Sequence, residues 1–197
     1  MGATRRARRG AVGEAPLRRL GALSRLDRRA FIQALGDVCE KSPWVAARAW
    51  EARPFATVAK LHAAMRKVLE AASKEEQLTV LRAHPELAGG AVRARSLTAF
   101  STREQAGAGL DRLTEPEAAR FDRLNAGYRA KFGFPFIICV RNRTGDGILR
   151  ALAQRLGNPV ASEVTTALRE VSEIMRHRLH RLTGTSSSSA RARGPGG

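Results

Sequence analysis

Between residues 20 and 182, apolar residues recur every three or four positions, which is the spacing of amphipathic helices. Capping signals divide this stretch into segments. Ser24 with Asp27 and Ser73 with Glu76 both match the capping-box pattern that opens a helix. Together, these patterns predict helices over residues 24–38, 42–50, 58–69, 73–84, 114–133, 146–156 and 160–182, with a further helix start at 101.

The segment 134–140, FPFIICV, is the one stretch that reads as a strand, and a lone strand has nothing to pair with. We therefore predict an all-α fold, a single compact domain of about seven or eight helices over residues 20–182, in which 134–140 is an extended buried connection. Extended backbone inside a helical protein leaves N–H and C=O groups that need partners. Water, neighbouring side chains or a bound polar ligand can supply them.

The positive charge of the chain is concentrated near its ends. Among 197 residues, 35 Lys and Arg stand against 18 Asp and Glu, which gives a formal net charge of +17. Residues 1–29 hold nine arginines and two acids, and residues 183–197 add two arginines and no acid. We predict that residues 1–19 form a disordered basic arm and that 183–197 form a disordered tail rich in Ser, Gly and Arg.

Other features of the sequence predict a soluble protein of a reducing compartment. No stretch reaches the roughly 20 uncharged apolar residues that cross a bilayer, and the arginine-rich start lacks the apolar core of a secretory signal. Cys39 and Cys139 each lie in an apolar stretch without metal-ligand spacing, so we expect two buried thiols. The chain ends in Pro-Gly-Gly rather than in a peroxisomal address, which favours a cytoplasmic protein.

The last predicted helix carries an arginine where an apolar residue is expected. Arg178 continues the stripe formed by Val171 and Met175. A guanidinium that faces a core needs an anion to bind, because an unpaired buried charge is costly. The alternatives are a structural ion pair, or a side chain that reaches solvent at the helix end. His177 and His180 leave the stripe, and we expect both to be solvated.

Two further places have both a structural and a functional interpretation. His84 lies where Pro85 must end a helix before a Gly-rich loop, because the residue before a proline is pushed out of the α region. An imidazole at this place can transfer protons near neutral pH, or it can serve only as the C-cap of the helix. Ser101 and Glu104 match an N-cap residue and its capping-box partner, although a helix start can also hold an anionic group.

Five motifs in order carry a family resemblance, whereas nucleotide-binding, zinc and serine-hydrolase motifs do not occur. The five are SPWVAARAW, HPELAG, STREQAGAGL, FDRLNAGYRAKFGFPFIICVR and REVSEIMRHRL. Their succession, from about residue 24 to 182, resembles the 2-oxo-4-hydroxy-4-carboxy-5-ureidoimidazoline (OHCU) decarboxylases of urate degradation. The resemblance implies an all-helical homodimer that converts OHCU to (S)-allantoin with loss of carbon dioxide and without a metal or organic cofactor.

The resemblance also implies roles for individual residues. The catalytic histidine of HPELAG is His84, and its acidic partner, the Glu of S-x-x-E-Q, is Glu104. Either residue of this pair, or both, would manage the proton. Cys39 and Lys41 depart from typical members, at a place expected to lie away from the site. The implied substrate-binding residues are Pro85, Ser101, Gln105, Phe136, Ile137, Ile138 and Arg178.

A competing hypothesis is a basic helical module that binds nucleic acid or an acidic protein. The charges between the tails alternate in sign along the predicted helices, as on solvated faces, and no nucleic-acid motif occurs. We therefore expect a small anionic substrate, no specific nucleic-acid partner and no membrane contact. A second alternative keeps the fold and replaces OHCU by a related ureido acid.

Overall fold

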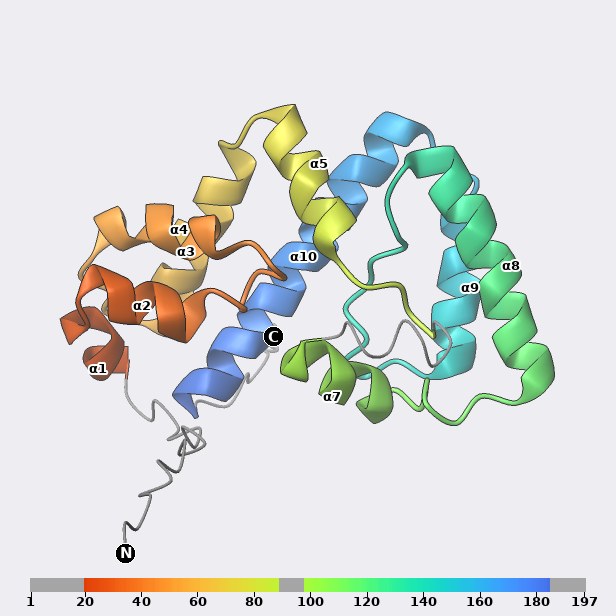
Figure 1. Ribbon diagram of the computed structural model, residues 1–197, viewed down its shortest axis with the longest axis horizontal. Coiled ribbons are helices and arrows are strands. Elements are labelled where there is room, and N and C mark those ends of the chain that lie inside the picture. Colours follow the sequence, from red (N-terminus) through yellow and green to blue (C-terminus); the bar gives the residue numbers. More distant parts are fainter. Residues whose placement is uncertain (1–19, 89–97, 185–197) are drawn as a thin grey trace, which may run out of the picture.

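The computed structural model describes residues 20–88 and 98–184, and these ranges form an all-helical domain without strands (Figure 1). This confirms the predicted fold class. Eight of the nine α-helices in these ranges correspond to predicted segments, and the ninth is the six-residue α1. The helices are α1 (Leu20–Arg25), α2 (Arg28–Leu35), α3 (Pro43–Ala49), α4 (Val58–Glu70), α5 (Lys74–Ala83), α7 (Ala99–Gly107), α8 (Glu115–Phe132), α9 (Gly145–Arg155) and α10 (Val160–Thr183), with a 3-10 turn at Trp50–Ala52.

Helix α10 is the element around which the domain is arranged. It runs diagonally between α1–α4 on one side and α8 and α9 on the other (Figure 1), and it contacts α4, α5 and α8. Its buried residues include Ala167, Val171 and Met175, which are four positions apart and therefore share one face. The same helix brings Arg178 into the interior, where the side chain is only 2% exposed.

Local capping signals account for most helix starts. The predicted capping box of α5 is present, because the Ser73 hydroxyl accepts from the Glu76 N–H while the Glu76 carboxylate accepts from the Ser73 N–H. The predicted box at Ser24 is wrong. Asp27 is itself the N-cap of α2, and its carboxylate accepts from the Ala30 N–H at 2.8 Å. The Asp27 carboxylate therefore caps this helix in place of the Ser24 hydroxyl.

Helix α8 ends where a glycine permits it. Gly133 has a φ of 74°, in the left-handed region that suits glycine. The chain then runs extended and largely buried through 134–140, as predicted. The ring of Tyr128 packs edge-on against Phe134 and Phe136, with centroids 5.9 and 5.3 Å away. These aromatic contacts fix the extended segment against α8.

Both cysteines are free thiols, but their burial differs from the prediction. Cys39 is buried, as expected, whereas Cys139 is only half-buried. The other side chains of the segment from Phe134 to Val140 are buried, and Cys139 is the exception. The apolar run around Cys139 is therefore not buried at every position.

The predicted terminal segments fall mostly outside the described residues, which begin at 20 and end at 184. Within them, α10 continues through Thr183 and is capped by Gly184 at a φ of 66°, so the predicted tail cannot start at 183. None of the helices in the described ranges is long and apolar enough to cross a membrane.

Candidate active site

A cavity of about 600 Å³ lies between the end of α5, helix α7, the segment 134–140 and the C-terminal part of α10. These four parts of the chain are far apart in sequence. The cavity is lined by all nine residues that the sequence predicted for a site, which are His84, Pro85, Ser101, Glu104, Gln105, Phe136, Ile137, Ile138 and Arg178.

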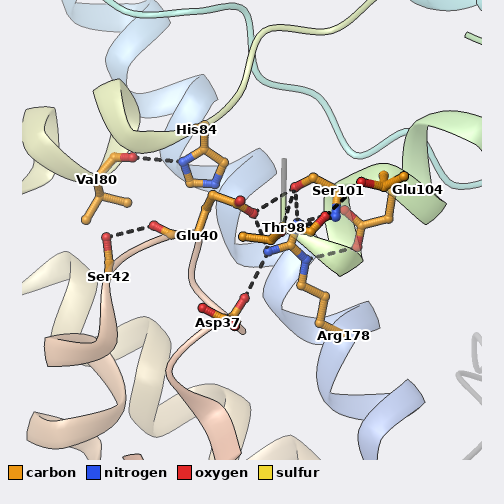
Figure 2. Close-up of polar contacts among 10 residues, drawn as sticks. Asp37, Glu40, Ser42, Val80, His84, Thr98, Ser101, Glu104 and Arg178 are labelled. Atoms are coloured by element: carbon orange, nitrogen blue, oxygen red, sulfur yellow. Dashed lines mark hydrogen bonds and ion pairs between the residues drawn. The ribbon is translucent and has the colours of Figure 1, made fainter. Parts of the chain in front are cut away.

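Arg178 is held by acceptors on every N–H of its guanidinium (Figure 2). Nε and Nη2 donate to the two carboxylate oxygens of Glu104 at 2.9 and 2.8 Å. Nη1 donates to Oε2 of Glu40 at 2.8 Å and to the Asp37 carbonyl at 3.1 Å. Nη2 also donates to the Ser101 hydroxyl at 3.1 Å. The structural ion pair, one of the alternatives that the sequence left open, is thus present, and two carboxylates flank one buried cation.

Glu40 and Arg178 favour each other's ionised form. Burial by itself would raise the pKa of Glu40, but the charge of Arg178 and hydrogen bonds from Arg178 and Ser101 outweigh burial, so the pKa is lowered. Burial would likewise lower the pKa of Arg178, and the neighbouring Glu104 and Glu40 raise it instead. Glu40 is therefore a permanent carboxylate at neutral pH.

His84 is the C-cap residue of α5, as one of the two interpretations predicts, and it also lines the cavity. Its Nδ1 lies 2.8 Å from the Val80 carbonyl, which can only accept, and the Nδ1 must therefore carry the proton. Burial lowers the pKa of His84 to about 4, although the Val80 carbonyl and the charge of Glu40 act in the opposite direction. At neutral pH the imidazole is neutral, with the lone pair on Nε2.

The structure corrects the predicted start of α7. The N-cap is Thr98, whose hydroxyl accepts from the Ser101 N–H at 3.3 Å, and the helix begins at Ala99. Ser101 and Glu104 lie inside the helix, three positions apart on one face. The Ser101 hydroxyl donates to Oε2 of Glu40 at 2.8 Å rather than capping a helix. The predicted capping box at 101 is wrong because tertiary partners occupy both side chains.

The loop after His84 is tied to helices on two sides. The Gln105 side chain of α7 accepts from the Ala88 N–H at 3.2 Å and donates to the Glu86 carbonyl at 3.3 Å. From α8, the buried Asn125 donates to the Leu87 carbonyl at 2.9 Å. The side chains of α7 and α8 therefore hold residues 86–88 in place beside the cavity.

The sequence left open whether water, side chains or a ligand would bind the backbone of the extended segment. At two positions, side chains do so. Arg155 donates from Nη1 to the Ile137 carbonyl at 2.8 Å, and it is itself paired with the fully buried Glu163. The Cys139 N–H donates to a carboxylate oxygen of Glu170 at 2.7 Å. The backbone that faces the cavity is thus fixed from behind.

The cavity wall is rich in cationic side chains. Arg103, Arg141 and Arg181 line it together with His177 and His180. The two histidines are half-buried, so the prediction that they are solvated is wrong. Burial, and then the charges of nearby arginines, lower the pKa of both. The cavity wall therefore includes residues of α10 outside its apolar stripe, and the arginines of the wall favour the binding of an anion.

Comparison with known proteins identifies the family. The family model "OHCU decarboxylase" matches residues 24–180. The chain belongs to the OHCU decarboxylase family. The 2-oxo-4-hydroxy-4-carboxy-5-ureidoimidazoline decarboxylase of Haloferax volcanii is 43% identical over 157 residues, 80% of this chain and 91% of that protein. The enzyme of the same name from Halalkalicoccus jeotgali is 42% identical over 161 residues, covering 82% and 89%. A crystal structure of (S)-allantoin synthase superposes with a TM-score of 0.65 at 30% identity, over 83% of this chain and 54% of that one.

In this member of the OHCU decarboxylase family, sequence reasoning missed the arginines of the cavity wall and also Glu40, a buried carboxylate that contacts the site from behind the wall. The neighbouring Cys39 and Lys41 were expected to lie away from the site, yet Glu40 between them pairs with Arg178. Burial raises the pKa of the Cys39 thiol to about 12, although the charge of the nearby Arg178 acts in the opposite direction. The need of Arg178 for an anion was the signal, but it did not say which carboxylate would provide it.

Proposed function

We propose that the chain decarboxylates OHCU to (S)-allantoin in this cavity, with His84 and Glu104 as the catalytic groups. Membership of the OHCU decarboxylase family supports the reaction. The observation that supports the site is geometric: a neutral histidine, a carboxylate and a buried arginine line one cavity with the extended segment. The proposed reaction involves no cofactor.

The chemistry sets three requirements. The bond between the ring carbon and the carboxylate breaks, carbon dioxide leaves, and the electron pair remains on the substrate, where a proton must replace the lost group. The site has to fix the carboxylate, stabilise the developing negative charge and deliver the proton to one face. Delivery to one face accounts for a single enantiomer of the product.

We assign these tasks to residues as follows. His84 and Glu104 contact the 4-hydroxyl of the substrate, and one of the pair returns the proton. Arg178 stabilises the developing charge, and the backbone near Ile137 binds ring oxygens or the ureido group. Contacts of Ser101, Gln105 and Pro85 complete the substrate site. The arginines of the cavity wall attract the anionic substrate.

The proposal extends to assembly and location. Family resemblance supports a homodimer, which sedimentation analysis of the purified chain tests directly. Two free thiols, one of them only half-buried, support a reducing compartment, and we propose the cytosol.

The test of the proposed site replaces His84 with Asn. OHCU is generated enzymatically from urate, and formation of (S)-allantoin is followed by circular dichroism. We expect the variant to lose about a hundredfold or more in rate while its far-ultraviolet spectrum stays unchanged. His62→Asn is the matched control, because His62 is half-buried, bonds to Ser172 and does not line the cavity.

Near-normal turnover by the His84 variant contradicts the assignment. A comparison of OHCU with related ureido acids as substrates of the wild-type protein tests the substrate separately. If a related ureido acid is consumed faster than OHCU, the proposed substrate is wrong while the proposed site stands.

A further inference from the structure

Glu40 lies behind the cavity wall. It is fully buried in the turn between α2 and α3, and it is not among the cavity-lining residues. Its Oε2 accepts from Nη1 of Arg178 and from the Ser101 hydroxyl, both at 2.8 Å. Each of these two partners lines the cavity. A single carboxylate oxygen therefore links α7 to α10 beneath the substrate site.

The second oxygen of Glu40 is in an unusual position. Oε1 is buried, and no group in residues 20–88 and 98–184 forms a hydrogen bond with it. Nε2 of His84 is likewise buried without a partner in these ranges. Figure 2 shows the Glu40 carboxylate between the imidazole of His84 and the Ser101 hydroxyl, with Nε2 toward it. Native proteins leave few buried polar atoms unpaired, so two such atoms beside a cavity indicate a function.

We propose that Glu40 is a positioning residue for the decarboxylation, which orients Arg178 and Ser101 from behind and supplies the negative charge that stabilises a proton on His84. The proposal rests on the proposed function. It adds a second carboxylate to the site, one that touches the catalytic machinery rather than the substrate.

The orienting role follows from how the guanidinium is divided. Glu40 and the Asp37 carbonyl take both N–H groups of Nη1. This leaves the edge formed by Nε and Nη2 facing Glu104 on α7. A planar guanidinium fixed at one corner cannot rotate about its long stem, so the edge toward the cavity stays in place.

The role toward His84 is electrostatic. The groups that act on the imidazole are the Val80 carbonyl, which accepts from Nδ1, and the opposite charges of Glu40 and Arg178. In the resting site, Nε2 of His84 and Oε1 of Glu40 can both only accept a hydrogen bond. A proton on Nε2 would make the imidazole a cation, which the Glu40 carboxylate attracts. Of the groups that favour the protonated imidazole, only Glu40 carries a full negative charge.

The experiment replaces Glu40 with Gln, which keeps the shape and removes the charge. We expect kcat/KM to fall about tenfold or more, mainly through kcat, since a hydrogen bond to a charged group is worth roughly that factor. Loss of the negative charge lowers the pKa of His84 further, so the acidic limb of the kcat/KM profile should move to lower pH. Ser42→Ala is the control, because Ser42 is buried in the same turn and its hydroxyl donates to the Glu40 backbone carbonyl rather than to the carboxylate. It should stay within about twofold of wild type.

Glu40→Asp separates the two roles, and serves if the Gln variant fails to fold. It keeps the charge but shortens the reach, so kcat should fall while the pH profile stays near that of the wild type. The proposal is overturned if Glu40→Gln has the rate and profile of Ser42→Ala, or if Glu40→Asp has the wild-type kcat. Either result with an inactive His84→Asn leaves the proposed function standing, whereas an active His84→Asn removes the proposed function itself.

Discussion

Replacing Arg178 with Met gives the sharpest test of the charge arrangement. The substitution keeps much of the apolar volume and removes five hydrogen bonds together with the partner of a fully buried carboxylate. Breaking a buried pair by removing one member costs about 3–5 kcal/mol, because the remaining charge is left unpaired. Glu104 adds less, since its side chain is 24% exposed and can be hydrated. We expect a loss of about 4 kcal/mol in the free energy of unfolding at neutral pH.

The loss should depend on pH in a defined direction. In the wild type the pKa of Glu40 is lowered, so the pair stabilises the fold above the unfolded pKa of about 4.5 and loses this contribution as pH falls through the folded value. Without Arg178, hydrogen bonds from hydroxyl groups alone oppose burial, and we expect the pKa of Glu40 to rise above its unfolded value. The unpaired carboxylate is then penalised increasingly as pH rises. The difference between wild type and variant should therefore be largest near pH 7 and become smaller as the pH falls.

Urea unfolding followed by circular dichroism at pH 4.5, 5.5 and 7 measures this difference. The double variant with Glu40→Gln added should recover more than half of the loss at pH 7, because no buried charge remains, yet it should stay inactive. A deficit below about 1 kcal/mol at pH 7 would refute the reasoning, since so small a loss is typical of an exposed pair. A deficit that does not change with pH, or a double variant no more stable than the single one, would refute it as well.

Three further outcomes follow from contacts elsewhere in the domain. Thr98→Ala removes the N-cap of α7 and should cost about 1 kcal/mol in a thermal melt, with a lower kcat/KM because α7 carries three site residues, Ser101, Glu104 and Gln105; an unchanged melt would contradict this. Tyr128→Phe takes a donor from the buried Glu163 and should cost about 1.5–3 kcal/mol in urea, and a neutral result would show that Glu163 finds another donor. Below pH 6.5 wild-type stability should fall as pH falls, because His84 binds a proton when unfolded but stays neutral in the fold down to about pH 4. His84→Asn should flatten that slope, and an identical slope would assign it to other groups.

Local sequence signals predicted the parts of the fold that depend on neighbouring residues. The capping box of α5 is closed by Ser73 and Glu76, three positions apart, so the pattern is sufficient by itself. The end of α8 at Gly133 depends on one residue that tolerates a positive φ. The apolar spacing of α10 placed Arg178 on the stripe that faces the interior, because a helix repeats every 3.6 residues.

The same local reasoning failed where two candidates compete within one turn. Thr98 and Ser101 are both good N-caps, and sequence alone favoured Ser101 because of Glu104. The structure uses Thr98, since Ser101 and Glu104 are engaged by Arg178, which is more than seventy residues away. Local capping preferences cannot decide between two N-cap residues when a distant charged residue binds the side chain of one of them.

The sequence by itself determined the helical class, the helix ends that local caps define, the family, and the candidate residues that carry chemistry. Only the tertiary structure decided which of these residues meet. Glu40 and Arg178 are separated by 138 positions and touch at 2.8 Å. No local pattern encodes that contact, because it depends on how α10 packs against the turn between α2 and α3. A period of 3.6 residues says which face of a helix is buried, whereas the partner of a buried charge is set by the chain that folding brings against that face.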